Sequence, residues 1–351
     1  MIRLDSTTIK IPHFGSWDIE LSKCRKIAVT EPILEDGMFP LRETTNTTFM
    51  IPSQSLKKGI KSIKVNNESL LVEVSAKILN SNYFEGINQN TIEQVWDVIG
   101  SISQVKLGKE SINEATILKC DCTYTLKLEQ PISPILYALK LYPINDKYKN
   151  NLKKGESLEF NHKGYTKRER LILYDKKIEL LSQEKDKQFV NSVLSKIEEN
   201  KNLLRIETNL SRHRDMREIL NIPSKQKFEG CSLLDVLQSK EHPTLKIYDK
   251  ILTVNPELKF DFFNYKEIEY FKKLQPSAMI KIEGYKGVLD KCLWDISNVR
   301  TYLLDVLCYN KSVVSKLIKE FNLEIARHNH SQDSKSIFKV VNEIRELLKV
   351  A

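Results

Sequence analysis

The spacing of hydrophobic residues divides the chain into a strand-rich first part and a helix-rich second part. Apolar and polar residues alternate, as expected for strands with one buried face, in five segments: 7–12, 60–65, 70–75, 115–126 and 203–210. Apolar residues recur at helical spacing in 92–102 and 178–200. Beyond residue 223 strand patterns become rare and helical spacing dominates, in 231–239, 264–274, 288–309, 311–327 and 334–349. The pattern predicts an α+β fold whose C-terminal region is mostly helical.

Two predicted strands in the middle of the chain carry an unusual set of polar side chains. Residues 168–180 contain an apolar run that ends at Tyr174, followed by Lys176 and Lys177. In the later strand, 203–210, alternation places three polar side chains on one face: Arg205, Glu207 and Asn209. A tyrosine beside lysines and opposite a carboxylate suits phosphoryl transfer. The same pattern also fits an ordinary sheet edge.

Composition and charge only partly decide between a phosphoryl-transfer site and an ordinary sheet edge. The chain has 351 residues, of which 41% are hydrophobic and 29% charged, which is typical of a globular protein with one large domain or two. The net charge of +9 favours an anionic partner, although a lysine-rich surface that only faces water gives the same net charge. No apolar run approaches the ~18 residues of a membrane span, so no membrane partner is expected.

The six cysteines are scattered and include no repeated pair at metal-binding spacing. They are expected to be reduced thiols in a cytoplasmic protein, rather than zinc ligands or a disulfide framework.

Several short blocks of the sequence, taken in order, resemble the gene II/gene X family of replication initiators from filamentous phages and plasmids. The blocks are the opening segment 1–12, Val72-Glu73-Val74 with the Asn82–Gly86 turn, Thr116–Thr123, Arg168–Leu180 and Leu204–Leu210. The similarity covers residues 1–223, and no block lies beyond Pro223. The family's enzymes nick one DNA strand at an origin and rejoin it in rolling-circle replication, within the bacterial host cytoplasm.

The resemblance implies a nickase-like, Rep-type antiparallel sheet in a catalytic domain of residues 1–223. The helical spacing beyond it predicts a second region, 224–351, that either binds DNA or packs against the catalytic domain. It places Tyr174 on the family's nucleophilic tyrosine, which forms a 5′-phosphotyrosyl bond and so allows rejoining without ATP. A phenol is a weak nucleophile until a base or cation assists it, and Lys176 and Lys177 are the nearest cations in the sequence. Without the resemblance, Tyr174 would be interpreted as an aromatic residue on an edge strand.

A divalent metal, Mg²⁺ or Mn²⁺, is expected to act with the tyrosine. Asp121, which is unusual in the middle of a strand, and Glu207 are the best candidate ligands, because hard cations prefer carboxylate oxygens. His162 is a weaker candidate for a further ligand, because a lone histidine on a strand is more often simply hydrogen-bonded.

Basic residues cluster around the tyrosine and glutamate motifs and are expected to contact the phosphates of origin DNA, single-stranded at the nick. These candidates are Lys163, Lys167, Arg168, Arg170, Arg205, Arg212 and Arg214. Arg205 has the alternative of pairing with Glu207 structurally. A host helicase or polymerase is a further candidate partner, and the oligomeric state is left open.

Two other functions stay open at this point. One is a catalytically inactive regulator that binds the origin with the same fold, and the other is a basic α+β protein without nuclease activity, in which Asp121, Glu207 and Tyr174 would lie far apart. A second Tyr-Asp-Lys sequence at Tyr248 is either another nucleophile or a packed residue of the helical region.

Overall fold

The chain folds into two compact units in a computed structural model. The first comprises Met1–Glu257 with Val341–Ala351, and the second comprises Leu258–Val340. The residues described are 1–12, 17–33, 42–66, 69–153, 157–164, 169–198, 201–223, 230–252, 262–263, 275–329 and 335–351.

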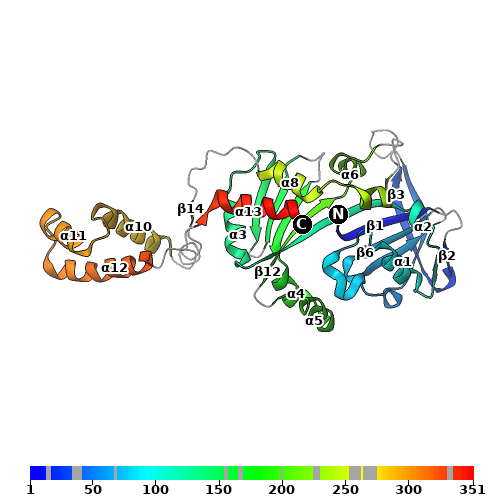
Figure 1. Ribbon diagram of the computed structural model, residues 1–351, viewed down its shortest axis with the longest axis horizontal. Helices are drawn as coiled ribbons and strands as arrows, with labels where there is room; N and C mark the ends of the chain where they lie inside the picture. Colours follow the sequence, from blue (N-terminus) through cyan, green and yellow to red (C-terminus); the bar gives the residue numbers. More distant parts are fainter. Residues whose placement is uncertain are drawn as a thin grey trace. The chain divides into compact units, whose positions relative to one another are not determined.

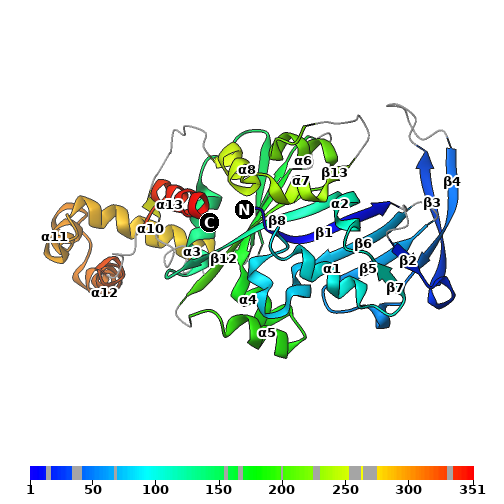
Figure 2. The ribbon, with the colours of Figure 1, turned by 45° about the vertical axis from the view of Figure 1, so that its right-hand side comes forward.

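An 11-stranded antiparallel sheet organises the first unit (Figure 1). The strand order is β3-β4-β5-β6-β1-β8-β12-β11-β10-β9, with β13 paired to β8. The strands are β1 (Leu4–Pro12), β3 (Arg25–Ile33), β4 (Arg42–Met50), β5 (Ile60–Val65), β6 (Ser69–Ser75), β8 (Thr116–Leu128), β9 (Tyr148–Lys153), β10 (Ser157–His162), β11 (Arg170–Asp175), β12 (Asn202–Leu210) and β13 (Cys231–Ser232). A separate ribbon pairs β2 (Trp17–Ile19) with β7 (Val105–Leu107), and Figure 2 shows β3 and β4 as a long hairpin at the sheet edge.

One face of the sheet is apolar and covered by helices. Along β12, Leu204 and Ile206 are fully buried on this face, while Arg205 and Glu207 lie on the other. The helices on the apolar side are α3 (Ile132–Leu141), α6 (His213–Leu220), α7 (Leu233–Gln238), α8 (Pro243–Leu252) and the part of α13 (Ile337–Val350) that belongs to the first unit.

The opposite, polar face is only partly covered. The covering elements are the 3₁₀ segment η3 (Ala76–Glu85) and two short helices, α4 (Lys176–Gln183) and α5 (Lys187–Leu194), which Figure 1 shows on the side away from α8 and α13. The helix α1 (Ile92–Gly100) packs against η3, and α2 (Ser111–Glu114) packs against α7 and β1. The remaining short elements are the 3₁₀ turns η1 (Leu21–Lys23) and η2 (Ser53–Ser55). On the polar face Lys176 and Arg205 are buried, whereas Tyr174 and Glu207 stay partly exposed.

The helix predicted at 178–200 is in fact two helices, so that prediction was wrong in its continuity. Asp175 accepts a hydrogen bond from the Ile178 amide at 3.0 Å, and Asp186 accepts one from the Phe189 amide at 3.0 Å. Each aspartate is an N-cap, so the chain starts a second helix at Lys187. The two caps therefore fix where α4 and α5 begin.

The second unit is helical. It contains α10 (Pro276–Lys291), α11 (Ile296–Thr301), the π-helical turn η4 (Tyr302–Val306) and α12 (Lys311–Asn329), together with the short pair β14 (Phe262–Phe263) and β15 (Lys335–Ser336). Its core is formed by Leu289, Cys292, Val299, Leu303, Val314, Ile318 and Phe321. The predicted helix at 264–274 lies outside the described residues.

The α+β class, with a large antiparallel sheet followed by a mostly helical region, is confirmed. The boundary at residue 223 between a catalytic domain and a helical region stays a prediction. The first compact unit extends to Glu257. Within the described part of the chain, the helices are all too short or too polar to span a membrane.

Candidate active site

Tyr174 and Glu207 meet on the polar face, where strands β11 and β12 run side by side. Tyr174 is paired in register with Arg205, and Glu207 lies two residues further along β12 on the same face. The Tyr174 hydroxyl donates a hydrogen bond to Glu207 Oε1 at 2.6 Å, and Lys176 Nζ lies 3.4 Å from the same hydroxyl oxygen. Lys176 reaches this position because it is the first residue of α4, directly after the Asp175 cap. The structure thus brings together the tyrosine, carboxylate and one lysine that the sequence singled out.

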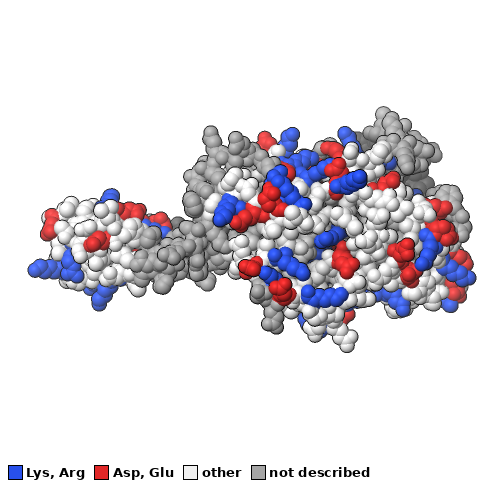
Figure 3. All heavy atoms as spheres, viewed as in Figure 1, with Lys and Arg blue, Asp and Glu red and all other residues white. Residues whose placement is uncertain are grey.

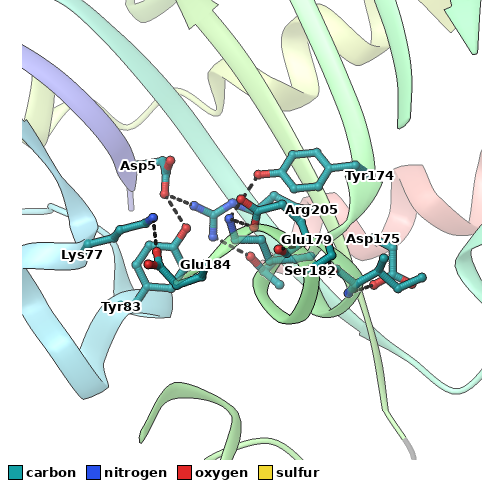
Figure 4. Close-up of polar contacts among 12 residues, drawn as sticks. Asp5, Lys77, Tyr83, Tyr174, Asp175, Glu179, Ser182, Glu184 and Arg205 are labelled. Carbon is teal, nitrogen blue, oxygen red and sulfur yellow. Dashed lines mark hydrogen bonds and ion pairs between the residues drawn. The ribbon is translucent and has the colours of Figure 1, made fainter. Parts of the chain in front are cut away.

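Arg205 lies beneath this group and is almost completely buried, with a relative exposure of 1%. Its Nε is 3.3 Å from Glu207 Oε1, and its Nη1 donates to Thr125 Oγ1 at 2.9 Å. Its Nη2 forms an ion pair with Asp5, which in turn accepts a hydrogen bond from the Tyr83 hydroxyl at 2.9 Å (Figure 4). Arg205 therefore joins two tyrosine–carboxylate pairs, Tyr174–Glu207 and Tyr83–Asp5.

A β-bulge in β1 explains how Asp5 reaches Arg205. Leu4 pairs with Cys122 and Ser6 pairs with Asp121, so two steps along β1 correspond to one step along β8. The extra residue is Asp5, and a bulge lets consecutive side chains point to the same face. Ser6 accordingly donates to Asp121 Oδ2 at 2.5 Å while Asp5 pairs with Arg205.

Burial and neighbouring charges shift the titration of these groups. Burial, together with the negative charge of Asp5, raises the pKa of Glu207 above its usual value. Burial, followed by the Glu207 charge, raises the pKa of Tyr174, and burial beside Arg205 lowers the pKa of Lys176. Burial alone would raise the pKa of Asp5, but Arg205 and Lys176 outweigh it and hold that pKa below its usual value. Glu207 is thus the stronger base of the two carboxylates, and it accepts the hydrogen bond of the Tyr174 hydroxyl.

The predicted metal ligands are only partly brought together. Asp121 pairs with Asn209 on β12, so it is a diagonal neighbour of Glu207 on the same face, at a Cα separation of about 7–8 Å. Asn209 Nδ2 donates to Asp121 Oδ1 at 2.5 Å. His162 lies on the opposite face of the sheet, where its Nδ1 accepts from the Gly164 amide at 2.9 Å and its ring packs against Tyr148.

Among the described residues, no three His, Cys, Asp or Glu side chains gather as a metal cage. A Mg²⁺ ion in phosphoryl transfer often takes only one or two protein carboxylates and completes its shell with water and substrate phosphate, so Asp121 and Glu207 stay candidate ligands. His162 does not fit such a site, because the sheet separates it from both carboxylates.

The predicted DNA contacts are spread over both faces and both ends of the sheet. Arg170 shares the Tyr174 face and is paired with Glu159 at 2.9 Å, while Lys163 is exposed just beyond β10. Arg212 and Arg214 lie at the start of α6, on the helix-covered side. Lys167 and Arg168 lie outside the described residues.

The face of the molecule drawn in Figure 3 has no single basic region. On the face shown in Figure 3, basic and acidic side chains are interspersed over the first unit. Arg205 is buried among its partners and does not face solvent, and Lys177 is a partly buried residue in the first turn of α4.

Sequence reasoning missed Asp5, Tyr83 and Thr125. Asp5 and Tyr83 both lie in blocks that carry the family resemblance, in segments 1–12 and 82–86. Nothing in the pattern of the sequence indicates that these two segments meet at Arg205. Tyr248 has no place in this centre: its side chain is fully buried and its hydroxyl donates to the Val341 carbonyl at 2.9 Å.

Comparisons with known proteins give only distant structural similarity. Neither a protein-family model nor a curated protein sequence matches the chain. Among solved structures, a rolling circle replication initiator protein from Geobacillus stearothermophilus is similar over 62% of this chain and 77% of its own, with 11% identity and a TM-score of 0.28. A TM-score this low leaves the function to be inferred from the site.

Proposed function

We propose that the chain nicks and rejoins one DNA strand at a replication origin, with Tyr174 as the nucleophile, and so initiates rolling-circle replication. The observation that carries the proposal is the hydrogen bond of 2.6 Å from the Tyr174 hydroxyl to Glu207, with Lys176 Nζ at 3.4 Å from the same oxygen. This arrangement supplies a nucleophile, a base and a cation at one point of the polar sheet face. The choice of DNA as substrate rests on the resemblance of the sequence blocks and on the net charge of +9.

The chemistry follows from the order of these contacts. Glu207 accepts the phenolic proton as the Tyr174 oxygen attacks the phosphorus of a phosphodiester. The new bond joins that oxygen to phosphorus, the bond from phosphorus to the 3′-oxygen breaks, and the 3′-oxygen takes up a proton. The strand is left with a free 3′-hydroxyl and a 5′-phosphotyrosyl link, and attack by a 3′-hydroxyl reverses the step. Lys176 stabilises the charge that develops near the tyrosine oxygen.

Two features of the centre suit this role. Because the pKa of Tyr174 is raised, the phenolate does not form in advance, and the proton leaves only during the attack. Because the pKa of Glu207 is also raised, the carboxylate is a better base than an exposed glutamate. Asp121, with Glu207 beside it, would hold Mg²⁺ or Mn²⁺, which would neutralise charge on the scissile phosphate.

The test is a nicking assay with supercoiled DNA from the replicon that encodes the chain, in Mg²⁺ or Mn²⁺. The proposal predicts open circles that carry covalently bound protein. Specific binding of that DNA without any nicking would instead indicate the inactive origin-binding regulator.

A further inference from the structure

The β-bulge in β1 places a second carboxylate, that of Asp5, against Arg205. Arg205 has a close ion pair with Asp5 and a longer contact, 3.3 Å, with Glu207 Oε1. That same Glu207 oxygen accepts the Tyr174 hydroxyl at 2.6 Å. Glu207 Oε1 therefore has both Arg205 and Tyr174 as neighbours, and the closer ion pair of the arginine is the one with Asp5.

We propose that Asp5 is a positioning residue for the tyrosine nucleophile: by holding Arg205, it leaves Glu207 Oε1 free to accept the Tyr174 proton. This inference rests on the proposed nicking function and adds residues to that centre that no sequence motif had assigned. Asp5 touches neither the tyrosine hydroxyl nor a reacting atom, so it acts only through Arg205.

The anchoring of Asp5 supports a positioning role. The Tyr83 hydroxyl donates to Asp5 Oδ1 at 2.9 Å, and the Arg205 guanidinium lies over the Tyr83 ring, with its central carbon 5.2 Å from the ring centre. Tyr83 is itself held by the edge of the Phe189 ring from α5, with the ring centres 5.6 Å apart. The aspartate is thus fixed on one side by η3 and on the other by the bulge, which leaves it little freedom to release the arginine.

The other contacts of Arg205 cannot replace Asp5. Thr125 Oγ1 accepts Nη1 at 2.9 Å but carries no charge, and the remaining charged partner is Glu207. If the Asp5 charge were removed, Glu207 would become the only carboxylate available to a buried guanidinium among its described contacts. The Arg205–Glu207 contact would shorten and the hydrogen bond from Tyr174 would weaken.

The experiment compares Asp5→Asn and Tyr83→Phe with the wild-type full chain in a nicking assay that yields kcat and KM separately. Asp18→Asn is the matched control, because Asp18 is an exposed aspartate on β2 with 74% of its side chain accessible. A positioned base contributes 10²–10⁴-fold to a reaction of this kind, so Asp5→Asn is expected to lower kcat by roughly 10- to 100-fold and leave KM unchanged. Tyr83→Phe keeps both charges and is expected to lower kcat by less, in the same direction.

The outcomes separate this proposal from the proposed function. If the wild-type chain forms no nicked product, the function itself is wrong. If the wild type nicks DNA and Asp5→Asn has the wild-type kcat, whether or not its KM changes, the positioning role is wrong. If Asp5→Asn melts below the assay temperature, Tyr83→Phe decides: a lowered kcat with a wild-type melting temperature supports the role, and a wild-type kcat overturns it.

Discussion

Replacing Arg205 with methionine removes the cation that forms ion pairs with both Asp5 and Glu207. The arginine is 1% exposed, and the side chains of Asp5 and Glu207 are only 22% and 16% exposed, so water screens the pair poorly. Removing one partner of a buried ion pair typically costs about 3–5 kcal/mol. The partial exposure of both carboxylates favours the lower end, about 3 kcal/mol, which corresponds to a fall in melting temperature of about 6–12 °C for a unit of this size.

The loss in the Arg205→Met variant should depend on pH, with a sign that follows from the carboxylates. Without the arginine, the folded-state pKa values of Asp5 and Glu207 should both lie above their ordinary values of 3.8 and 4.5. The folded variant then binds more protons than the unfolded chain above those values, so its stability falls as pH rises through that window. The variant should therefore be closest to the wild type in mild acid and furthest from it at neutral pH.

Tryptophan fluorescence can follow the first unit alone. The chain has three tryptophans, and Trp17 and Trp96 are buried in the first unit while Trp294 belongs to the second. Urea unfolding in a Trp294→Phe background at pH 7 and pH 5 measures the stability, with Arg214→Met as the control for losing an exposed arginine. A variant within about 1 kcal/mol of that control at pH 7 would refute the buried network, because exposed charges contribute no more than this.

Three further predictions concern other residues. Burial lowers the pKa of His242 from 6.5 to about 4, so the free energy of unfolding should fall by about 1–2 kcal/mol, after allowance for partial exposure, between pH 6.5 and pH 4. Melting curves of His242→Asn, which keeps a hydrogen-bond acceptor at the start of α8, should lack this fall, and an equal fall in the variant would contradict the assignment. Asp121→Asn should raise the Mg²⁺ concentration for half-maximal nicking about tenfold or more, because an amide is a weaker ligand for a hard cation; an unchanged Mg²⁺ titration would remove Asp121 from any metal site. Tyr248→Phe should nick at the wild-type rate, since its hydroxyl only bonds the Val341 carbonyl, and a folded but inactive variant would move the nucleophile to Tyr248.

Much of the sheet was predictable because its strands alternate strictly. Residues 60–65 and 70–75 are found as β5 and β6, and the apolar run that ends at Tyr174 is found as β11. The alternation of β12 also placed Arg205 and Glu207 correctly on one face. These features depend on the sequence within a single strand, which is where the period-2 pattern is informative.

Features that depend on how strands meet could not be predicted. His162 follows the same alternation as its neighbours, but its face is fixed by the register of β10 on β11, and a shift of one residue would reverse it. Asp5 reaches the polar face only through a bulge, which no local pattern indicates. The break between α4 and α5 depends on Asp186 acting as a cap inside an otherwise continuous helical pattern.

The most direct test of the account is to identify the residue that becomes linked to DNA. The full chain is incubated with supercoiled origin DNA and Mg²⁺ or Mn²⁺, denatured and digested, and the peptides that carry nucleotide are identified by mass spectrometry. The account predicts a 5′-phosphate ester on Tyr174, present in Tyr248→Phe and absent in Tyr174→Phe. Nicked DNA without attached protein, or an adduct on any other residue, would contradict it.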